Sequence, residues 1–200
     1  MNRTKRKDYP NGDWEETVYN DIGSELSFKS NDGFWRESTF NANDKLLTYK
    51  DSLGNWEEKQ YNQNGGCVCE KSGKATYWNE HVFDDQGNEL SFKNSIGTWS
   101  KSTWNERGLQ LTFKSSEGWF KCTYDAKGNE LTRKDHEGWS KSTYDDCGRS
   151  LTFKDSDGFW INRSYEGNKH YSKNSNGDWS EETVDQEGNV LVRKEGNIND

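Results

Sequence analysis

The sequence lacks most of what builds an ordinary aliphatic core. Only 28% of its 200 residues are hydrophobic, and it contains one proline, one methionine and no long apolar run. So low an apolar fraction is typical of disordered chains, but those chains are also poor in aromatic residues. Here there are ten Trp, nine Tyr and nine Phe. Because each buried aromatic side chain removes about 150 to 250 Å² from water, we expect an aromatic core.

Other absences exclude classes of partner and compartment. No apolar segment follows the basic start of the chain, so we expect neither a signal peptide nor a membrane span, and a cytoplasmic protein. The net charge of −8 makes a nucleic-acid or anionic-membrane partner unlikely, and leaves a basic protein partner or a nucleic-acid-like surface open. Cys67, Cys69, Cys122 and Cys147 follow no disulfide framework and are expected to be free thiols.

What the chain does have is a repeat with a period of about 21 residues. Nine copies follow one another, each marked by a tryptophan. The anchors are Trp14, Trp35, Trp56, Trp78, Trp99, Trp119, Trp139, Trp160 and Trp179. Since a repeat array is one quasi-one-dimensional unit, we predict a single domain over residues 1–200.

Each copy is predicted to be a β-hairpin, as in 139–154. The first strand runs from Trp139 to Tyr144, and this odd offset puts the two rings on opposite faces unless a bulge intervenes. An Asp145-x-x-Gly148 turn follows, because an Asx side chain closes its own backbone turn and glycine supplies a positive φ. The second strand reads Leu-x-Phe-Lys, with Leu and Phe on one face.

A lysine closes the second strand of every copy and forms a row on the face away from the leucine. These residues are Lys29, Lys50, Lys71, Lys93, Lys114, Lys134, Lys154, Lys173 and Lys194. A succession of such hairpins predicts an all-β antiparallel meander of about eighteen strands. Equivalent strands then lie roughly 9.6 Å apart, so we expect a ladder of Trp, Leu and Trp. To hide its apolar face, the sheet should curl into a spiral, a shell or a barrel-like closure.

Two copies carry a family resemblance. The run Tyr124-Asp125-Ala-Lys-Gly128-Asn-Glu-Leu131, and its counterpart in 144–151, resembles the YD repeat of bacterial Rhs proteins and teneurins. That resemblance implies a spiralling β-sheet shell in miniature, although the constant Gly-x-Trp start and the closing lysine depart from the pattern. A weaker similarity links the chain to aromatic hairpin repeats that bind choline on cell walls, which have a different Trp spacing.

Copies that break the pattern point to binding residues, since local irregularity in a regular array usually has a functional or capping cause. The eighth copy is two residues short, and central copies carry lysine where the outer copies have glutamate pairs. The binding candidates are His81, Lys101, Trp104, Lys121, Arg133, His136, Lys141 and His170.

The sequence gives little support for a catalytic site or a metal site. Cys67-x-Cys69 with His81 lacks zinc spacing and a fourth ligand, so free core-filling cysteines are favoured. The three histidines lie in separate copies with no nucleophile motif, and the Lys and Trp rows are better explained as solvated face and core. We therefore expect no enzyme, no metal and no cofactor.

The leading hypothesis is a non-enzymatic protein that binds a partner protein, in the style of a bacterial or phage-encoded inhibitor of a host factor. Its basis is the charge variation along a regular scaffold: acidic pairs such as Glu15-Glu16 at the ends, and Lys101, Lys121 and Lys141 in the centre. The alternative is a glycan, cell-wall or nucleotide binder with aromatic pockets between hairpins. Exposed end strands would also permit a homodimer.

Overall fold

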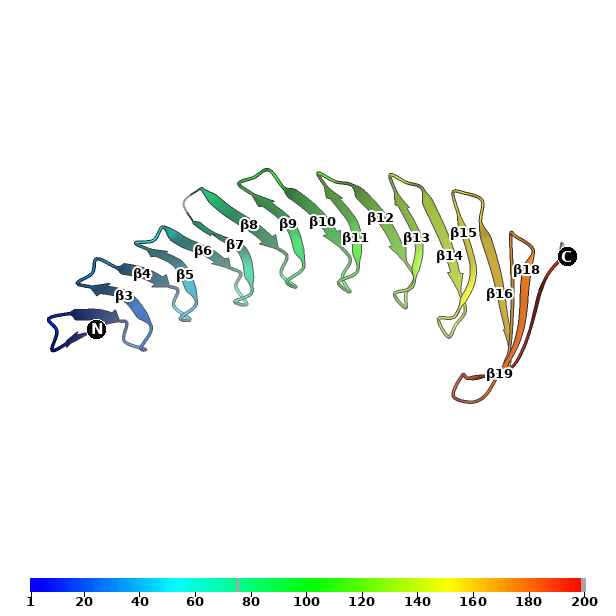
Figure 1. Cartoon of the computed structure of the whole chain (residues 1–200), viewed down its shortest axis with the longest axis horizontal. Helices are drawn as coiled ribbons and strands as arrows, with labels where there is room; N and C mark the ends of the chain where they lie inside the picture. The colour runs from blue at the N-terminus through cyan, green and yellow to red at the C-terminus, as the bar shows by residue number, and fades with distance from the viewer. Residues whose placement is uncertain (75, 199–200) are drawn as a thin grey trace. The chain divides into compact units, whose positions relative to one another are not determined.

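The structure, a computed structural model that describes residues 1–74 and 76–198, confirms the hairpin-repeat meander. It contains nineteen strands within the described residues, which follow one another along the chain as antiparallel hairpins (Figure 1). No helix in the described part of the chain is long and apolar enough to cross a membrane. The backbone contacts group into two units, Met1–Thr103 and Trp104–Asp200, which we describe separately. The prediction of a single domain stays a prediction.

The first unit holds ten strands. They are β1 (Arg3–Asp8), β2 (Trp14–Tyr19), β3 (Glu25–Ser30), β4 (Trp35–Phe40), β5 (Leu46–Asp51), β6 (Asn55–Tyr61), β7 (Cys67–Lys74), β8 (Tyr77–Phe83), β9 (Glu89–Asn94) and β10 (Trp99–Trp104), whose last residue belongs to the second unit.

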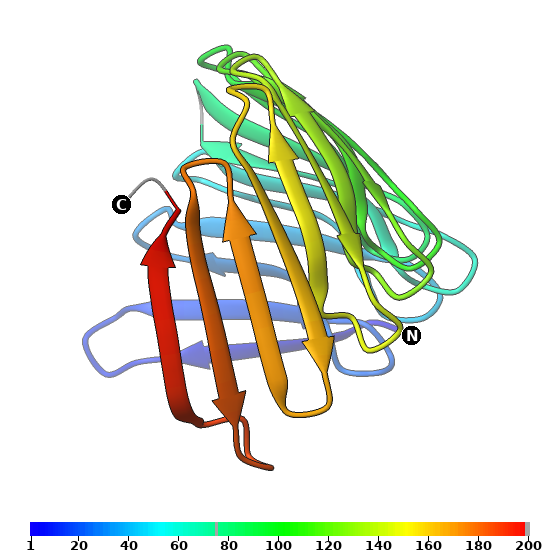
Figure 2. The ribbon, with the colours of Figure 1, turned by 90° about the vertical axis from the view of Figure 1, so that its right-hand side faces the viewer.

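The second unit holds the remaining nine strands. They are β11 (Gln110–Ser115), β12 (Trp119–Tyr124), β13 (Glu130–Asp135), β14 (Trp139–Tyr144), β15 (Ser150–Asp155), β16 (Trp160–Glu166), β17 (Lys169–Asn174), β18 (Asp178–Val184) and β19 (Val190–Asn197). Figure 2 shows β16 to β19 from the end of the unit, side by side in one layer.

The turn inside each hairpin forms as its sequence predicts. The Asp145 carboxylate accepts hydrogen bonds from the backbone N–H groups of Cys147 and Arg149, 2.9 and 2.8 Å away. Gly148 provides the positive φ of 80° that this turn requires. In the second copy Asp44 stands in the glycine's place and adopts a φ of 59°, which an Asx residue tolerates better than other side chains.

A β-bulge recurs where the first strand of a copy meets the second. In β14 and β15 the register shifts between Thr143 and Tyr144, so that Tyr144 pairs with Ser150 and one residue is extra on β15. The eighth copy has no such shift, and Tyr165 pairs directly with His170. Its missing two residues therefore remove the bulge and tighten the turn.

In four of the described copies a tyrosine hydroxyl bonds to the copy before it. The Tyr144 hydroxyl donates to the carbonyl oxygen of Glu130, 3.1 Å away, and Glu130 adjoins the bulge of the preceding copy. Three further tyrosines make the equivalent bond: Tyr61 to Leu46, Tyr124 to Gln110 and Tyr165 to Ser150, at 2.9 to 3.1 Å. Each of these bonds therefore joins two consecutive copies through a side chain.

The expected ladder of Trp, Leu and Trp is wrong. The residue directly across from Trp139 on the neighbouring strand is Lys134, and Trp35, Trp56, Trp99, Trp119, Trp160 and Trp179 likewise face the closing lysine of the preceding copy. The length of the return loop sets this register, and period-two alternation then sends Phe to the opposite face. The lysine row on the face away from the apolar row is confirmed.

The prediction of an aromatic core is also wrong about burial, because the rings are less deeply buried than we expected. Among the described residues only Cys122 and Val184 are buried apolar side chains, with 1% and 7% exposure. Most rings are half-buried within a single layer, because neighbouring rings and the long stems of Lys and Arg cover their flanks. Neither unit closes into a barrel: β1 pairs with β2 and β19 with β18, and no further partner strand is found for these edges in the described part of the chain.

The first strand is one that the repeat pattern did not predict. Arg3–Asp8 has no apolar alternation, yet Arg6 lies across from Glu16 and Lys7 across from Glu15 of β2. Opposite charges across strands stabilise such pairs, and a charged edge discourages pairing with other chains. The basic N-terminal segment is therefore part of the sheet.

Candidate binding surface

The strand register assembles lysine and tryptophan into three-residue rows across consecutive strands. Lys121 on β12 lies across from Lys134 on β13, which in turn lies across from Trp139 on β14. The next copy repeats the row with Lys141 on β14, Lys154 on β15 and Trp160 on β16. We call these two rows the Lys–Lys–Trp triads.

The triads belong to a longer cationic strip on the tryptophan face of the second unit. The strip consists of Lys114, Lys121, Lys134, Lys141 and Lys154. All five side chains are exposed, and no carboxylate lies within ion-pair distance of any of them among the described residues. Trp119 and Trp139 beside them are 39% and 37% exposed. The strip is a free positive surface with indole rings set into it.

An open groove runs along this face. It has a volume of about 390 Å³ and is bordered by Lys121, Lys134, Trp139 and Lys141, with Thr123 and Thr132 at its floor. The two threonine hydroxyls lie 2.6 Å apart and hydrogen-bond to each other. The Lys141 ammonium lies 5.6 Å from the ring centre of Trp139, near enough for a cation–π contact. The groove therefore offers cations and one apolar ring.

Corresponding rows in the first unit have glutamate in the leading position. Lys50 forms an ion pair with Glu37 at 3.0 Å. Glu80, only 16% exposed, is held by Lys71 and Lys93, each 3.0 Å away. Burial alone would raise the pKa of Glu80, but hydrogen bonds from both lysines lower it below the ordinary value. In this unit the lysine row is part of the sheet's own charge balance.

Arg133, a predicted binding residue, is engaged on the opposite face. Its guanidinium lies 4.2 Å from the ring centre of Phe120 and 3.8 Å from the Glu130 carboxylate. It also approaches the sulfur of Cys122 to 3.7 Å. Burial and the neighbouring Glu130 raise the pKa of the Cys122 thiol. Cys122 is a free thiol, as the sequence predicts, and it is buried beside Arg133.

The three histidines lie on separate elements. His136 is exposed in the turn after β13 and, with Trp119 and Phe120, borders a groove of about 340 Å³. His81 on β8 packs 4.8 Å from the Phe92 ring centre and reaches Glu89 at 2.9 Å. The structure does not gather the histidines into one site.

Of the remaining predicted residues, Lys121 and Lys141 are brought together in the strip. His170 on β17 meets the Tyr165 ring edge-on at 5.0 Å and serves the hairpin. Lys101 is exposed on β10 of the first unit, opposite Ser91, and Trp104 is half-buried at the start of the second unit. Lys114, Lys134 and Lys154 were not predicted as binding residues; their alignment with Lys121 and Lys141 depends on the hairpin register.

The cysteine pair of the third copy does not join His81. Cys69 lies across from Val82, which adjoins His81 in β8, so the Cys69 and His81 side chains point to opposite faces. Burial raises the pKa of Cys67. Within the described residues, no three His, Cys, Asp or Glu side chains gather closely enough to hold a metal ion.

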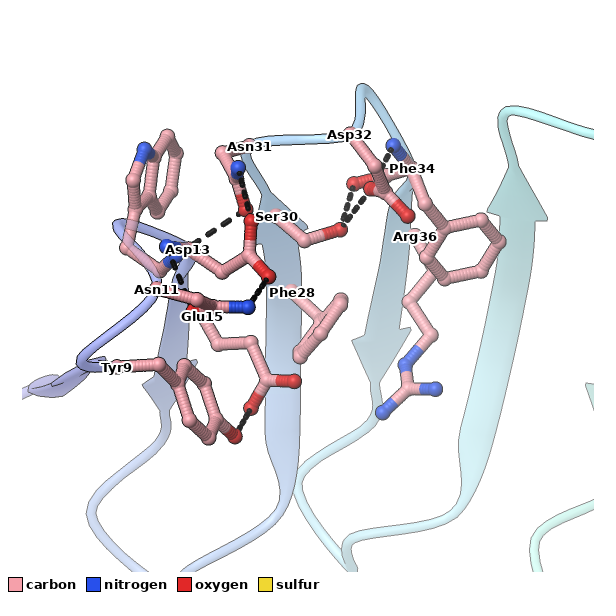
Figure 3. Close-up of a pocket in the computed structure, with 11 residues that line it drawn as sticks. Tyr9, Asn11, Asp13, Glu15, Phe28, Ser30, Asn31, Asp32, Phe34 and Arg36 are labelled. Atoms are coloured by element: carbon pink, nitrogen blue, oxygen red, sulfur yellow. Dashed lines mark hydrogen bonds between the residues drawn. The ribbon is translucent and has the colours of Figure 1, made fainter.

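Another groove, of about 610 Å³, lies at the start of the first unit and was not predicted (Figure 3). Tyr9, Trp14, Phe28 and Phe34 contribute rings to it. Its carboxylates are engaged with neighbours, as Figure 3 shows. Tyr9 donates to Glu15 at 2.9 Å, Asn31 to Asp13 at 2.8 Å and Ser30 to Asp32 at 2.5 Å.

The position of Arg36 limits this groove. Its guanidinium lies 4.7 Å from the Phe28 ring centre and is hydrogen-bonded to Glu25, which raises the pKa of Arg36. One wall includes Tyr9 and Asn11 of the loop between β1 and β2, which precedes the first copy of the repeat. For that reason the repeat pattern did not predict the groove.

No protein-family model matches the sequence, and no curated protein matches it. Three solved structures are similar: TcdB2-TccC3-Cdc42 (TM-score 0.42, 14% identity), TcdB2-TccC3 without its hypervariable C-terminal region (0.41, 13%) and TcdB2-TccC3 (0.39, 14%). They cover 92%, 91% and 96% of this chain, which spans 11% of each of theirs.

Proposed function

We propose that this chain is a non-enzymatic interaction protein that binds a partner protein through the tryptophan face of its second unit. The observation that supports this is the cationic strip, in which lysine replaces the glutamate that balances the same row in the first unit. Directly opposed like charges destabilise a sheet by roughly 0.2 to 1 kcal/mol per pair. A bound partner that supplies negative charge would offset that cost.

The test is a partner search with a matched charge variant. The purified chain and its Lys121→Glu/Lys141→Glu variant are each used to capture proteins from bacterial lysate, and the complexes are sized in solution. We expect one partner in fixed stoichiometry on the wild type and its loss on the variant. Absence of any stoichiometric partner on the wild type would contradict the proposal.

Membership of the YD-repeat group is a further part of the proposal. In both YD-like copies the tyrosine hydroxyl bonds to the preceding bulge carbonyl and the aspartate closes the turn, which gives the Tyr-Asp pair a structural reason. We also propose, from the sequence-based hypothesis of an inhibitor of a bacterial host factor, that the chain acts in the cytoplasm. Capture from lysates of several bacteria tests which factor is held.

Self-association through the sheet edges is also proposed. The β19 edge exposes Val190, Leu191 and Val192, at 51%, 64% and 54%. Apolar side chains on an edge strand favour pairing with another chain. A concentration-dependent increase in mass by light scattering, abolished by Val192→Lys, is the expected result, and a monomer at every concentration would contradict it.

The second candidate function is small-ligand binding in the groove of Figure 3. Four rings beside carboxylates suit a cationic ligand such as choline. Titration of Trp fluorescence with choline, cell-wall fragments and nucleotides tests this candidate, with Trp14→Phe as the variant that should lose the signal. If none of the three ligands changes the Trp fluorescence, this candidate function is excluded.

A further inference from the structure

The cationic strip has a chemistry that specifies its occupant more closely. Within one triad two ammonium groups start from directly opposed positions on neighbouring strands, Lys121 with Lys134 and Lys141 with Lys154. Neighbouring strands are about 4.8 Å apart. Two lysines at that spacing, with no carboxylate within reach in the described part of the chain, form a site for an anion pair.

The triad also has an apolar end. Trp139 follows Lys134 on the next strand and leaves 37% of its surface uncovered. Trp119 stands beside Lys114 in the preceding copy and is 39% exposed. Indole rings that are half-buried by their own sheet gain from apolar contact with a partner side chain. The occupant therefore combines negative charge with apolar groups at short intervals.

The strip is short and is bordered by acidic turns at one end of its strands. These turns carry Glu117, Asp135, Glu137, Asp155 and Asp157, whereas at the other end Lys127 and Arg149 accompany the carboxylates. The whole chain has a net charge of −8. A long phosphate polymer that crossed the acidic end would be repelled, whereas a short segment confined to the strip would not.

From these features we infer that the strip binds a short acidic segment of a partner protein, in which Asp or Glu residues alternate with aliphatic or aromatic ones. The segment lies across β11 to β15, with its carboxylates on the lysine pairs and its apolar side chains on Trp119 and Trp139. Lysine rather than arginine suits this occupant, since a point charge accepts carboxylates from many directions as the segment settles. The inference rests on the proposed function and names its partner's chemistry.

The test uses the whole chain with three fluorescent probes of equal length. They are a peptide of Asp, Glu and Leu, its counterpart with Asn and Gln, and oligodeoxythymidine. Anisotropy is measured at low and physiological salt. We expect the acidic peptide to bind and the neutral peptide to bind at least tenfold more weakly. Physiological salt should weaken the binding of the acidic peptide. Equal binding of both peptides, or tighter binding of oligodeoxythymidine, would overturn the inference.

Two charge variants locate the site. Lys121→Glu/Lys141→Glu copies the Glu–Lys–Trp row of the first unit, so it should fold, as a circular dichroism melt will check, and should bind the acidic peptide at least tenfold more weakly. The matched control, Glu16→Lys/Glu37→Lys, builds two Lys–Lys–Trp rows in the first unit and should gain affinity for it. If the first variant keeps its peptide affinity, the site is wrong. If the variant loses a captured partner but the wild type does not bind the acidic peptide, partner binding at this face stands and this inference fails.

Discussion

The two units build the same hairpin but stabilise it by different means. In the first, glutamates balance the lysine row through ion pairs such as Lys50 with Glu37, and among the described residues of this unit only Tyr61 bonds back to the preceding copy. In the second, the described lysines of the strip have no carboxylate partner, and three tyrosines bond back: Tyr124, Tyr144 and Tyr165. A scaffold that is secured through one face can leave the other free for a partner.

The largest effect is expected at Gly73, which lies across from Trp78 in the first unit. A Cβ there would lie 2.8 Å from Trp78 Cα and closer still to the Tyr77 carbonyl oxygen, both backbone atoms. Gly73→Ala should therefore lower the free energy of unfolding by about 1–3 kcal/mol, measured by urea denaturation. Gly118→Ala in the second unit, where the nearest atom is His136 Cε1 at 3.5 Å, is the matched control. Equal losses would contradict the prediction.

Removing one tyrosine hydroxyl should weaken the second unit. Tyr144→Phe leaves the Glu130 carbonyl without its donor and should cost about 0.5–1.5 kcal/mol of unfolding free energy. Phe at this position occurs naturally in Phe40 and Phe83 of the first unit, so the ring itself is tolerated. If Tyr144→Phe leaves the urea midpoint unchanged, the bond between copies has no energetic role.

Breaking the Glu80 pairs should weaken the first unit. Glu80→Gln removes the charge that Lys71 and Lys93 share, and solvent screening limits the loss to about 0.5–1 kcal/mol at neutral pH. Because the pKa of Glu80 is lowered from its ordinary 4.5, its contribution is complete above pH 4.5 and is lost as the pH falls below that value. The difference between wild type and variant should shrink on acidification. A difference constant from pH 7 to strongly acidic solution would refute this.

The smallest effect is expected from Lys141→Glu alone. It replaces two opposed lysines with the Glu and Lys pairing of the first unit and should raise Tm by about 1–2 °C. The same change removes part of the proposed binding site. Thermal melts at low salt provide the measurement, and Lys141→Gln separates the loss of repulsion from the gain of attraction. A lower Tm for the glutamate variant would show that the lysine pair does not destabilise the sheet.

The sequence predicts the hairpins well because their signals are local. Trp spacing, the Asp or Asn turn and the closing lysine each act within one copy, and the structure confirms the strands and turns they indicate. The strand register, in contrast, depends on the bulges and return loops that join one copy to the next. The recurrent bulge after Thr143 and the return-loop length decide that Trp139 meets Lys134 and not leucine, and no residue in the repeat marks either choice.

The structure differs from the sequence-based predictions in two further features, and both have causes outside the repeat pattern. The β1 strand has no apolar alternation and forms because its basic residues lie opposite Glu15 and Glu16. The shallow burial of the rings arises because each layer is covered along its length by side-chain stems and not by a second sheet. The sequence therefore predicted only part of the candidate site. Lys121 and Lys141 were predicted from their place in the central copies, whereas the other lysines of the strip could be identified only from the strand register.

The tyrosine bond always points the same way, from a copy to the one made before it. Tyr144 needs a carbonyl that Glu130 has already supplied, and Tyr165 needs one from Ser150. As the chain leaves the ribosome, each emerging hairpin meets a finished acceptor and waits for nothing downstream. Growth of the sheet can thus keep pace with synthesis, one copy at a time.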